Sequence, residues 1–283
     1  MGSRVLITGG TGTFGKAMTR HLLKETDHTV CILSRDEHKQ EVMAREFSEH
    51  ADRLRFFIGD IRDKERTARA LRKVTNVFHA AALKVIPSCE YNVSETIATN
   101  VRGTENLVDL CAQSDTITKF LLISTDKAVM PINAYGMAKA LAEKIVTSAP
   151  HNYGNPNCVF GAIRLGNVIG STGSVIPIWR KQLAENGRVT ITDPEVTRFW
   201  MSVDEAVALI DNTIETMQGG EFAIPTLPSF RLGDLAAAMD AGYDVTSLPE
   251  WEKVHEGMSD MNRSDNARRM SVEEIRERLK EVG

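Results

Sequence analysis

A glycine-rich segment near the start of the chain is the feature that most constrains the fold. In the sequence VLITGGTGTFG, Gly9, Gly12 and Gly15 recur every three residues between a strand-like run and a helical pattern. The first glycine permits a tight turn, the second lets backbone N–H groups approach a pyrophosphate, and the third lets the helix pack closely on the strand. A tight strand-to-helix turn alone also favours glycine, but the position at the start of a βαβ unit favours a dinucleotide-binding loop. The cofactor-binding residues expected in this loop are Gly9, Thr11, Gly12, Thr13, Phe14 and Gly15.

The first 165 residues alternate short apolar runs with amphipathic helical patterns. The apolar runs are nearly continuous, as expected for parallel strands whose two faces are both covered by helices. This βαβ alternation predicts an α/β fold with a Rossmann-type, doubly wound parallel sheet. The expected strands are 4–10, 29–34, 54–60, 76–82, 119–124 and 158–165, and the expected helices include 15–26, 64–73, 100–113 and 134–147.

The end of the second expected strand indicates which dinucleotide the loop prefers. An NAD-preferring site usually has a carboxylate here, which binds the ribose 2′-hydroxyl. This chain instead has Ser34 and Arg35, with Lys39 one helical turn later, and Arg and Lys side chains suit a 2′-phosphate. We therefore expect NADP, although Asp36 leaves open an inward-facing carboxylate or simply an exposed, charged helix start. Asp60 and Ile61 are expected beside the adenine, and Ala80, Ala81 and Ala82 beneath the cofactor.

The pattern changes after residue 165, where glycine, serine and proline cluster over residues 166–177. We expect an NADP-binding domain over residues 1–165. A smaller, mainly substrate-binding domain is expected over residues 166–283, with some segments returning to the first domain. Open α/β sheets bind ligands at the carboxyl ends of their strands, so the smaller domain is expected there. The last segment reads as a charged amphipathic helix with Ser271 as its cap before Glu274.

Composition excludes several classes of protein. Thirty-four basic and 38 acidic residues give a net charge of −4, which argues against a broad nucleic-acid-binding surface. No apolar run approaches the roughly 20 residues that span a bilayer. The four cysteines form no CxxC pair, and the histidines show no metal-ligand spacing, so no metal site is expected. We expect a soluble, reduced, cytoplasmic protein whose cysteines are buried thiols.

A catalytic constellation follows the fifth expected strand, which ends at Thr125, Asp126 and Lys127. Tyr135 and Lys139 come next, four residues apart on one helix face. A neighbouring ammonium is expected to lower the pKa of the phenol toward working pH. A tyrosinate can then take a hydroxyl proton while hydride leaves for a nicotinamide. The alternatives are a chance Tyr-x-x-x-Lys spacing and a surface ion pair between the acidic and basic residues at the strand end.

These motifs resemble those of extended short-chain dehydrogenases/reductases. The chain is most similar to inverting UDP-N-acetylglucosamine 4,6-dehydratases of polysaccharide and flagellin-glycan biosynthesis. The resemblance covers most of residues 4–240, and SDN with SVEEIRERL fits the family's last helix. It rests on ITGGTGTFGK, SRDEHKQ, FFIGDIRDKER, HAAALKVIPSCEYN, TNVRGTENL, ISTDKAVMPINAYGMAK, RLGNVIGSTGSVIP, ITDPEVTRFWMS and TLPSFRLGDLA.

The resemblance implies a role for each catalytic residue, with Thr125 counted among them. Tyr135 would oxidise the sugar at C4 together with NADP, while Lys139 would hold the cofactor ribose and tune the phenol. Lys127, kept neutral by desolvation and a cationic nicotinamide, would then remove the C5 proton. Asp126 would protonate the departing C6 hydroxyl. Hydride would return to C6, so that NADP is recycled, and reprotonation on the other face would invert C5. Retaining relatives have Glu at the Lys127 position, which indicates the inverting branch.

The resemblance also implies a UDP-sugar site on the substrate side, with one further cofactor contact at Val168. The expected substrate-binding residues are Lys84, Asn100, Asn167, Val175 and Arg198. Two have plain alternatives, since Asn167 can cap a turn and Arg198 can pair with Glu195 or Asp193. His79, in an apolar strand, is expected to be a hydrogen-bonded core residue. The chain departs from the family at Val85, Leu165, Thr172 and residues 247–253, where a phosphate-contacting Arg is missing.

The leading interpretation is an NADP-dependent lyase that makes a UDP-2-acetamido-2,6-dideoxy-4-keto-hexose. A UDP-sugar 4-epimerase shares the fold and the Tyr/Lys pair, but it needs neither Asp126 nor Lys127. A 5,6-dehydratase would stop at an unsaturated sugar. A non-catalytic NADP-binding regulatory protein would need none of these side chains. The expected partners are a UDP-sugar and further copies of the chain in a homo-oligomer, with no nucleic acid and no membrane segment.

Overall fold

A seven-stranded parallel sheet forms the centre of the protein, which we describe from a computed structural model over residues 2–154, 157–171 and 173–281. The strand order is β10-β6-β5-β4-β1-β2-β3, and every neighbouring pair is parallel. The predicted doubly wound α/β sheet is therefore confirmed. Its strands are β1 (Arg4–Thr8), β2 (Thr29–Ser34), β3 (Leu54–Ile58), β4 (Asn76–His79), β5 (Lys119–Thr125), β6 (Val159–Leu165) and β10 (Glu221–Ala223).

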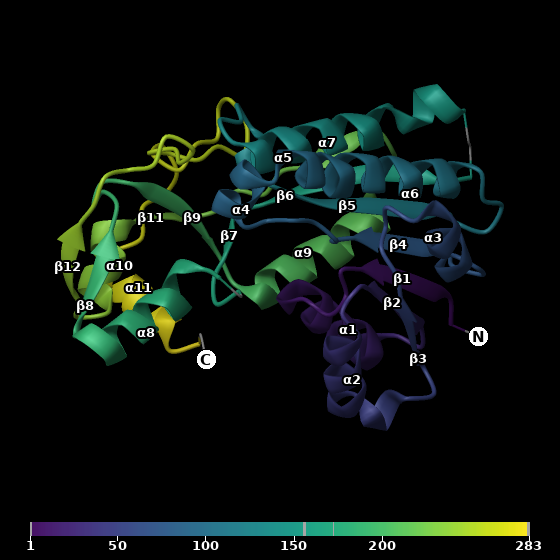
Figure 1. The fold of residues 1–283 in the computed structure, drawn as a ribbon, viewed down its shortest axis with the longest axis horizontal. Coiled ribbons are helices and arrows are strands. Elements are labelled where there is room, and N and C mark those ends of the chain that lie inside the picture. The colour runs from purple at the N-terminus through teal and green to yellow at the C-terminus, as the bar shows by residue number, and fades with distance from the viewer. Residues whose placement is uncertain (1, 155–156, 172, 282–283) are drawn as a thin grey trace.

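Helices cover both faces of this sheet, as Figure 1 shows. One face carries α3 (Lys64–Ala70), α6 (Gly103–Ala112) and α7 (Ala134–Tyr153), and the other carries α1 (Thr13–Glu25), α2 (Glu37–Glu46) and α9 (Val203–Thr216). Each face has its own apolar core, one including Leu107 and Val146 and the other including Met18 and Ile210. Because both faces are buried, the strand sequences are apolar throughout. Shorter helical elements are α4 (Ile86–Tyr91), α5 (Val93–Thr96), a π-helical turn (Ile97–Arg102) and 3-10 turns at Ser48–His50 and Asp126–Ala128.

A smaller unit lies beside the carboxyl ends of the central strands (Figure 1). Its core includes Trp200 and Phe230, whose rings meet edge to face with centroids 5.4 Å apart. Two small sheets, β11-β9-β7 and β12-β8, build it together with three helices. The elements are β7 (Asn167–Val168), α8 (Val175–Asn186), β8 (Arg188–Ile191), β9 (Thr197–Met201), β11 (Ser229–Arg231), α10 (Leu232–Ala238), β12 (Gly242–Val245) and α11 (Val272–Leu279).

Several local features confirm the sequence-based predictions, and one short strand was not predicted. Ser271 caps α11, because its side chain accepts a hydrogen bond from the Glu274 N–H at 3.2 Å, as predicted. Buried His79 contacts Thr8 Oγ1 at 2.7 Å and Thr104 Oγ1 at 2.9 Å, so its prediction as a satisfied core residue is confirmed. The short strand β10, which pairs with β6, was not predicted. All four cysteines are buried thiols, as expected.

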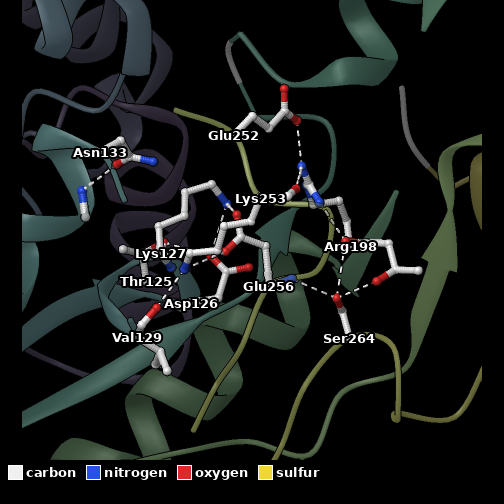
Figure 2. Close-up of polar contacts among 12 residues, drawn as sticks. Thr125, Asp126, Lys127, Val129, Asn133, Arg198, Glu252, Lys253, Glu256 and Ser264 are labelled. Atoms are coloured by element: carbon white, nitrogen blue, oxygen red, sulfur yellow. Dashed lines mark hydrogen bonds and ion pairs between the residues drawn. The ribbon is translucent and has the colours of Figure 1, made fainter. Parts of the chain in front are cut away.

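One stretch of the smaller unit runs back to the carboxyl end of β5, and we call residues 251–258 the return segment. Three hydrogen bonds tie it to the central sheet and its loops: Asn133 Nδ2 donates to the Trp251 carbonyl (2.9 Å), Lys253 Nζ to the Val129 carbonyl (2.6 Å) and Arg164 Nη1 to the Met258 carbonyl (2.9 Å). Figure 2 shows two of these side chains, Asn133 and Lys253, around the end of β5. The return segment therefore brings residues from the end of the chain next to the predicted catalytic residues.

Candidate active site

The glycine-rich loop has the close approaches that its sequence predicts. Gly9 has a φ of +67°, and a Cβ there would lie 2.9 Å from the Ala81 main chain. A Cβ on Gly15 would lie 2.4 Å from Gly10, so the start of α1 also requires a glycine. Gly12 is the N-cap of α1 and has no side chain to compete for the first amide groups of the helix. Such a cap leaves the N-terminal amides accessible to an anion.

A pocket of about 170 Å³ lies next to this loop. It brings together predicted cofactor residues from the ends of four strands: Gly9, Thr11, Ser34, Arg35, Asp36, Lys39, Asp60, Ile61, Ala81 and Ala82. The remaining predicted cofactor residues lie at the start of α1 (Thr13, Phe14, Gly15), after β4 (Ala80), in β7 (Val168) and in α7 (Tyr135, Lys139). A larger, open hollow of about 570 Å³ between α7 and β10 contains none of the predicted site residues among its lining.

The charged side chains at one end of this pocket determine whether it can bind the expected 2′-phosphate of NADP. Asp36 caps α2, since its Oδ1 accepts a hydrogen bond from the Lys39 N–H at 3.0 Å. Asp36 therefore starts a helix, as one of the alternatives held, but it also lines the pocket, so its place in the cofactor site stays a prediction. Arg35 is half exposed, and its guanidinium lies 3.7 Å from Asp60 Oδ2. Asp60 is held more closely by Arg62, at 2.8 Å, so the Arg35 guanidinium is only loosely paired.

The acid of the predicted catalytic pair is completely enclosed. Asp126, 1% exposed, begins the 3-10 turn after β5, and its Oδ1 accepts hydrogen bonds from Thr125 Oγ1 (3.0 Å) and Lys127 Nζ (3.1 Å). Its Oδ2 is buried and has no hydrogen-bond partner among the described residues. Burial raises the pKa of Asp126, although the Lys127 ammonium opposes this shift. A carboxyl group in this setting holds a proton more readily than an exposed one.

A second carboxylate, which sequence reasoning missed, contacts the predicted base. Glu256 in the return segment lies with Oε1 3.4 Å from Lys127 Nζ and with Oε2 3.3 Å from Lys253 Nζ (Figure 2). Burial alone would lower the pKa of Lys127, but the carboxylates of Asp126 and Glu256 together raise it above its usual range. The alternative of a surface ion pair is wrong, because the Asp126 side chain is 1% exposed and that of Lys127 only 17%. A neutral Lys127 was expected with a nicotinamide bound, so it stays a prediction.

Tyr135 and Lys139 lie one turn apart at the start of α7, but their electrostatics differ from the prediction. Burial raises the pKa of Tyr135 to about 12, and Lys127 and Thr125 only partly oppose it. The expected lowering of this pKa is therefore wrong in the ligand-free protein. Lys139 Nζ donates a hydrogen bond to the Ile123 carbonyl at 2.7 Å. Burial lowers the pKa of Lys139 to about 8, against the opposing charge of Glu143.

Two predicted substrate residues are held by other parts of the chain. Asn100, in the π-helical turn, uses both ends of its amide on the Leu83 main chain, at 2.8 Å each. Asn100 therefore fixes the loop that carries exposed Lys84, whose pKa is lowered by partial desolvation. Buried Arg198 pairs with Glu252 of the return segment at 2.5 Å, so the alternative of a pair with Glu195 or Asp193 is wrong.

Two buried side-chain oxygens at or next to the predicted substrate residues lack a hydrogen-bond partner. Within the described residues, neither Asn167 Oδ1 in β7 nor Ser174 Oγ, just before Val175 and α8, has a hydrogen-bond partner. The Asn167 oxygen thus caps no turn. Buried polar atoms are normally paired, so these oxygens suit a polar ligand. Thr172, one of the departures from the family, lies outside the described residues.

The described residues contain neither a cluster of metal ligands nor a helix that could span a membrane. Over residues 2–154, 157–171 and 173–281, no group of three His, Cys, Asp or Glu side chains is placed to hold a metal ion. In the same part of the chain, no helix combines the length and apolar character needed to cross a membrane.

Proteins of known sequence and structure resemble this chain over most of its length. A Campylobacter jejuni protein named UDP-N-acetylglucosamine 4,6-dehydratase (inverting) is 43% identical over 258 residues, which cover 90% of this chain and 76% of that protein. A Rickettsia rickettsii protein named UDP-glucose 4-epimerase is 40% identical over 239 residues, covering 83% and 69%.

The fold is shared with solved structures. The X-ray structure of Pen from Bacillus thuringiensis superposes with a TM-score of 0.94 at 32% identity, covering 99% of this chain and 97% of that one. A dTDP-glucose 4,6-dehydratase, DesIV from Streptomyces venezuelae with NAD and TYD bound, gives 0.80 at 22% identity, covering 89% and 86%. The sequence model of the family described as polysaccharide biosynthesis protein matches residues 5–277. The chain therefore belongs to the polysaccharide biosynthesis protein family.

Proposed function

We propose that this protein is an NADP-dependent UDP-N-acetylglucosamine 4,6-dehydratase, a lyase that inverts C5. The observation that carries the proposal is the buried Asp126–Lys127 pair beside Tyr135, at the carboxyl edge of a sheet with a dinucleotide loop. An acid and a base next to a redox tyrosine suit removal of water from an oxidised sugar. The relative from Campylobacter jejuni supports an enzyme acting on nucleotide sugars.

A nicotinamide dinucleotide fits the residues that are present. The glycine loop leaves no room for side chains, and the adjoining pocket collects residues from four strand ends. Structural neighbours are described with bound NAD. We propose NADP rather than NAD, because Asp36 is used as a helix cap and Arg35 is available for a 2′-phosphate. When bound, this cofactor accepts hydride from C4 and supplies it again at C6.

In the first half of the proposed reaction, Tyr135 accepts the proton of the C4 hydroxyl. Burial keeps the phenol protonated in the ligand-free protein, so it must first pass its own proton on. Thr125 orients the phenol and the acid, because its hydroxyl interacts with the phenol and donates a hydrogen bond to Asp126 Oδ1 at 3.0 Å. The phenol proton itself goes to bulk water, since Asp126 takes its proton from Lys127. Lys139, fixed by the Ile123 carbonyl, would hold the cofactor ribose.

In the second half, Asp126 and Lys127 remove the elements of water. Oxidation at C4 makes the C5 proton acidic, and Lys127 takes this proton. Asp126 gives a proton to the departing C6 hydroxyl, a role that its raised pKa supports. The two residues share one proton through the 3.1 Å contact, and that proton must lie on Asp126 when the reaction starts. Lys127 as the base is also the reason we propose the inverting branch.

The sugar nucleotide is proposed to bind between the two units. Lys84, Asn167, Val175 and Arg198 remain proposed contacts, whereas Asn100 acts by fixing the Leu83 loop. We also propose that residues 1–165 bind the dinucleotide and that residues 166–283 mainly bind the sugar nucleotide. The proposal includes a homo-oligomer located in the cytoplasm.

A UDP-sugar 4-epimerase is the second candidate, because the relative from Rickettsia rickettsii carries such a name. Incubation with NADP and UDP-N-acetylglucosamine, followed by NMR of the product, separates the two. The proposal predicts a C4 keto group and a C6 methyl group. A 4-epimer that keeps its C6 hydroxyl would establish the epimerase, and a 5,6-double bond would establish the 5,6-dehydratase. No conversion by NADP-loaded protein would favour the non-catalytic binder.

The Asp126→Asn variant, which keeps the shape but donates no carboxyl proton, should lose dehydration and retain NADP binding.

A further inference from the structure

We propose that Glu256 is a positioning residue that holds Lys127 as an ammonium between turnovers and makes it a stronger base toward C5. The catalytic part of this inference rests on the proposed function. The structural part, that Glu256 controls the charge of Lys127, does not. Its starting point is the position of Lys127 Nζ, which lies 3.1 Å from Asp126 Oδ1 and 3.4 Å from Glu256 Oε1.

Glu256 is held in place from several sides. Its residue is 3% exposed, and Oε2 lies 3.3 Å from Lys253 Nζ. Its main-chain N–H donates to Ser264 Oγ at 2.9 Å (Figure 2). Ser264 Oγ is in turn 2.6 Å from Thr197 Oγ1 in β9. Lys253 also donates to the Val129 carbonyl, directly after the 3-10 turn. The carboxylate is therefore fixed against the turn that carries Lys127.

The groups facing Lys127 come from four parts of the fold. Asp126 and Glu256 favour the ammonium, whereas burial and the Arg198 guanidinium in β9 oppose it. Tyr135 of α7 is neutral while its phenol is protonated. Glu256 itself remains ionised, because Lys127, Arg198 and Lys253 outweigh its burial and lower its pKa. The second carboxylate therefore adds to the effect of Asp126.

The size of this effect follows from the 3.4 Å separation. Two unit charges at that distance change a pKa by about one unit in a fully water-like medium and by about three to four units at an effective dielectric constant near 20. Lys253 partly neutralises the Glu256 carboxylate, so we expect a shift of the Lys127 pKa in the lower part of this range. Loss of the Glu256 charge should thus increase the neutral fraction of Lys127 by at least about tenfold.

The proposed chemistry balances with this assignment. In the resting pair, the shared proton is on Lys127. Before dehydration it moves to Asp126, which leaves a neutral amine. The C5–H bond then breaks and an N–H bond forms on Lys127. The electron pair enters the C5–C6 bond as the C6–O bond breaks, and the Asp126 proton leaves with the hydroxyl as water. The pair ends as ammonium and carboxylate, which is the resting state that Glu256 stabilises.

Competitive labelling of amines tests the inference without turnover. NADP-loaded protein, free of sugar nucleotide, is treated with a small amine-methylating reagent at pH 8, and mass spectrometry compares Lys127 with exposed Lys144. Only neutral amines react, so Glu256→Gln should label Lys127 at least about tenfold faster than wild type. Glu256→Asp keeps the charge and should stay close to wild type. Glu250→Gln, at an exposed carboxylate next to the return segment, should leave labelling unchanged.

Two results would overturn the inference. Equal labelling of Lys127 in Glu256→Gln and wild type would show that the carboxylate does not control the amine. Equal acceleration in the Gln and Asp variants would show that the segment only shields Lys127 sterically. A second measurement, the pH profile of deuterium incorporation at C5 from D₂O, should shift to lower pH in Glu256→Gln, because Lys127 then loses its proton more readily. If wild type makes no dehydrated product, the proposed function fails, while the labelling result still decides the role of Glu256.

Discussion

Replacement of Glu143 by Gln should destabilise the protein far more than loss of an exposed carboxylate. Glu143 lies on α7 one turn after Lys139 and is 2% exposed. Its carboxylate accepts hydrogen bonds from Ser124 Oγ (2.6 Å) and from two nitrogens of Arg164 (2.9 and 2.8 Å). The Gln variant keeps an acceptor for Ser124 but leaves the Arg164 charge without its partner.

The expected loss follows from the burial of both partners. Removing one member of a buried ion pair typically costs about 3–5 kcal/mol. The Arg164 side chain is 15% exposed and stacks on Phe222, with its guanidinium 4.7 Å from the ring centroid. This partial access and the cation–π contact should soften the penalty, so we expect about 3 kcal/mol for Glu143→Gln.

Urea unfolding at neutral pH measures this loss as a change in midpoint at constant m. The matched control is Glu215→Gln, because Glu215 forms an ion pair with Lys119 at 3.2 Å but is 62% exposed. That control should cost about 0–1 kcal/mol. Leu at both Glu143 and Arg164 should recover stability relative to Glu143→Gln, since no unpaired charge remains buried. A cost below about 1 kcal/mol for Glu143→Gln, equal to the control, would refute the reasoning.

Three further outcomes are expected. Lys127→Ala should fold, bind NADP and still oxidise C4, so that near-ultraviolet absorbance of reduced cofactor builds up while product formation falls about 10²–10⁴-fold. Near-normal dehydration by this variant would remove Lys127 from the mechanism. Arg35→Ala should weaken NADP binding much more than NAD binding in a titration, and an equal loss for both would mean that Arg35 does not read the 2′-phosphate. Acid should destabilise the protein through His79, whose pKa falls from 6.5 to about 3 on burial. The unfolded state binds the proton more tightly, so stability is lost as pH falls from 6.5 toward 3, by up to about 5 kcal/mol. The His79→Gln variant should lose this part of the pH dependence in urea unfolding, and an unchanged dependence would count against it.

The central sheet was accessible to sequence reasoning because its strands carry a strong local signal. Strands buried on both faces are continuous apolar runs, and β2 was predicted with the bounds that it has in the structure. By contrast, β10 has three residues and begins with an exposed glutamate. So short a stretch carries no sequence pattern that predicts a strand. It becomes a strand only because it pairs with β6.

The candidate site shows the same division between local and long-range information. Asp126 and Lys127 lie in the 3-10 turn directly after β5, and Tyr135 and Lys139 lie at the start of α7, so a short motif places them together. Glu256 reaches Lys127 only through the return segment, more than a hundred residues later. The residues around Glu256 form no local motif that assigns it a role.

The charge states of the site were also beyond the sequence. The pKa values of Tyr135 and Lys127 rise for opposite reasons, the first through burial and the second through two carboxylates that outweigh burial. Helical spacing brings Tyr135 and Lys139 onto one face, but it does not specify how deeply either is buried. In the structure, burial raises the pKa of the Tyr135 phenol, and the ammonium that lowers it is that of Lys127. Only the packed structure shows this.

The fate of the hydrogen at C4 distinguishes a 4,6-dehydratase from an epimerase and from a simple dehydrogenase. UDP-N-acetylglucosamine carrying deuterium at C4 is incubated with catalytic amounts of the protein and NADP, and the product is examined by NMR and mass spectrometry. The proposed dehydratase gives a 4-keto sugar with one deuterium in its C6 methyl group, without net formation of reduced cofactor. Deuterium retained at C4 of an epimer, or left in stoichiometric reduced cofactor, would contradict it.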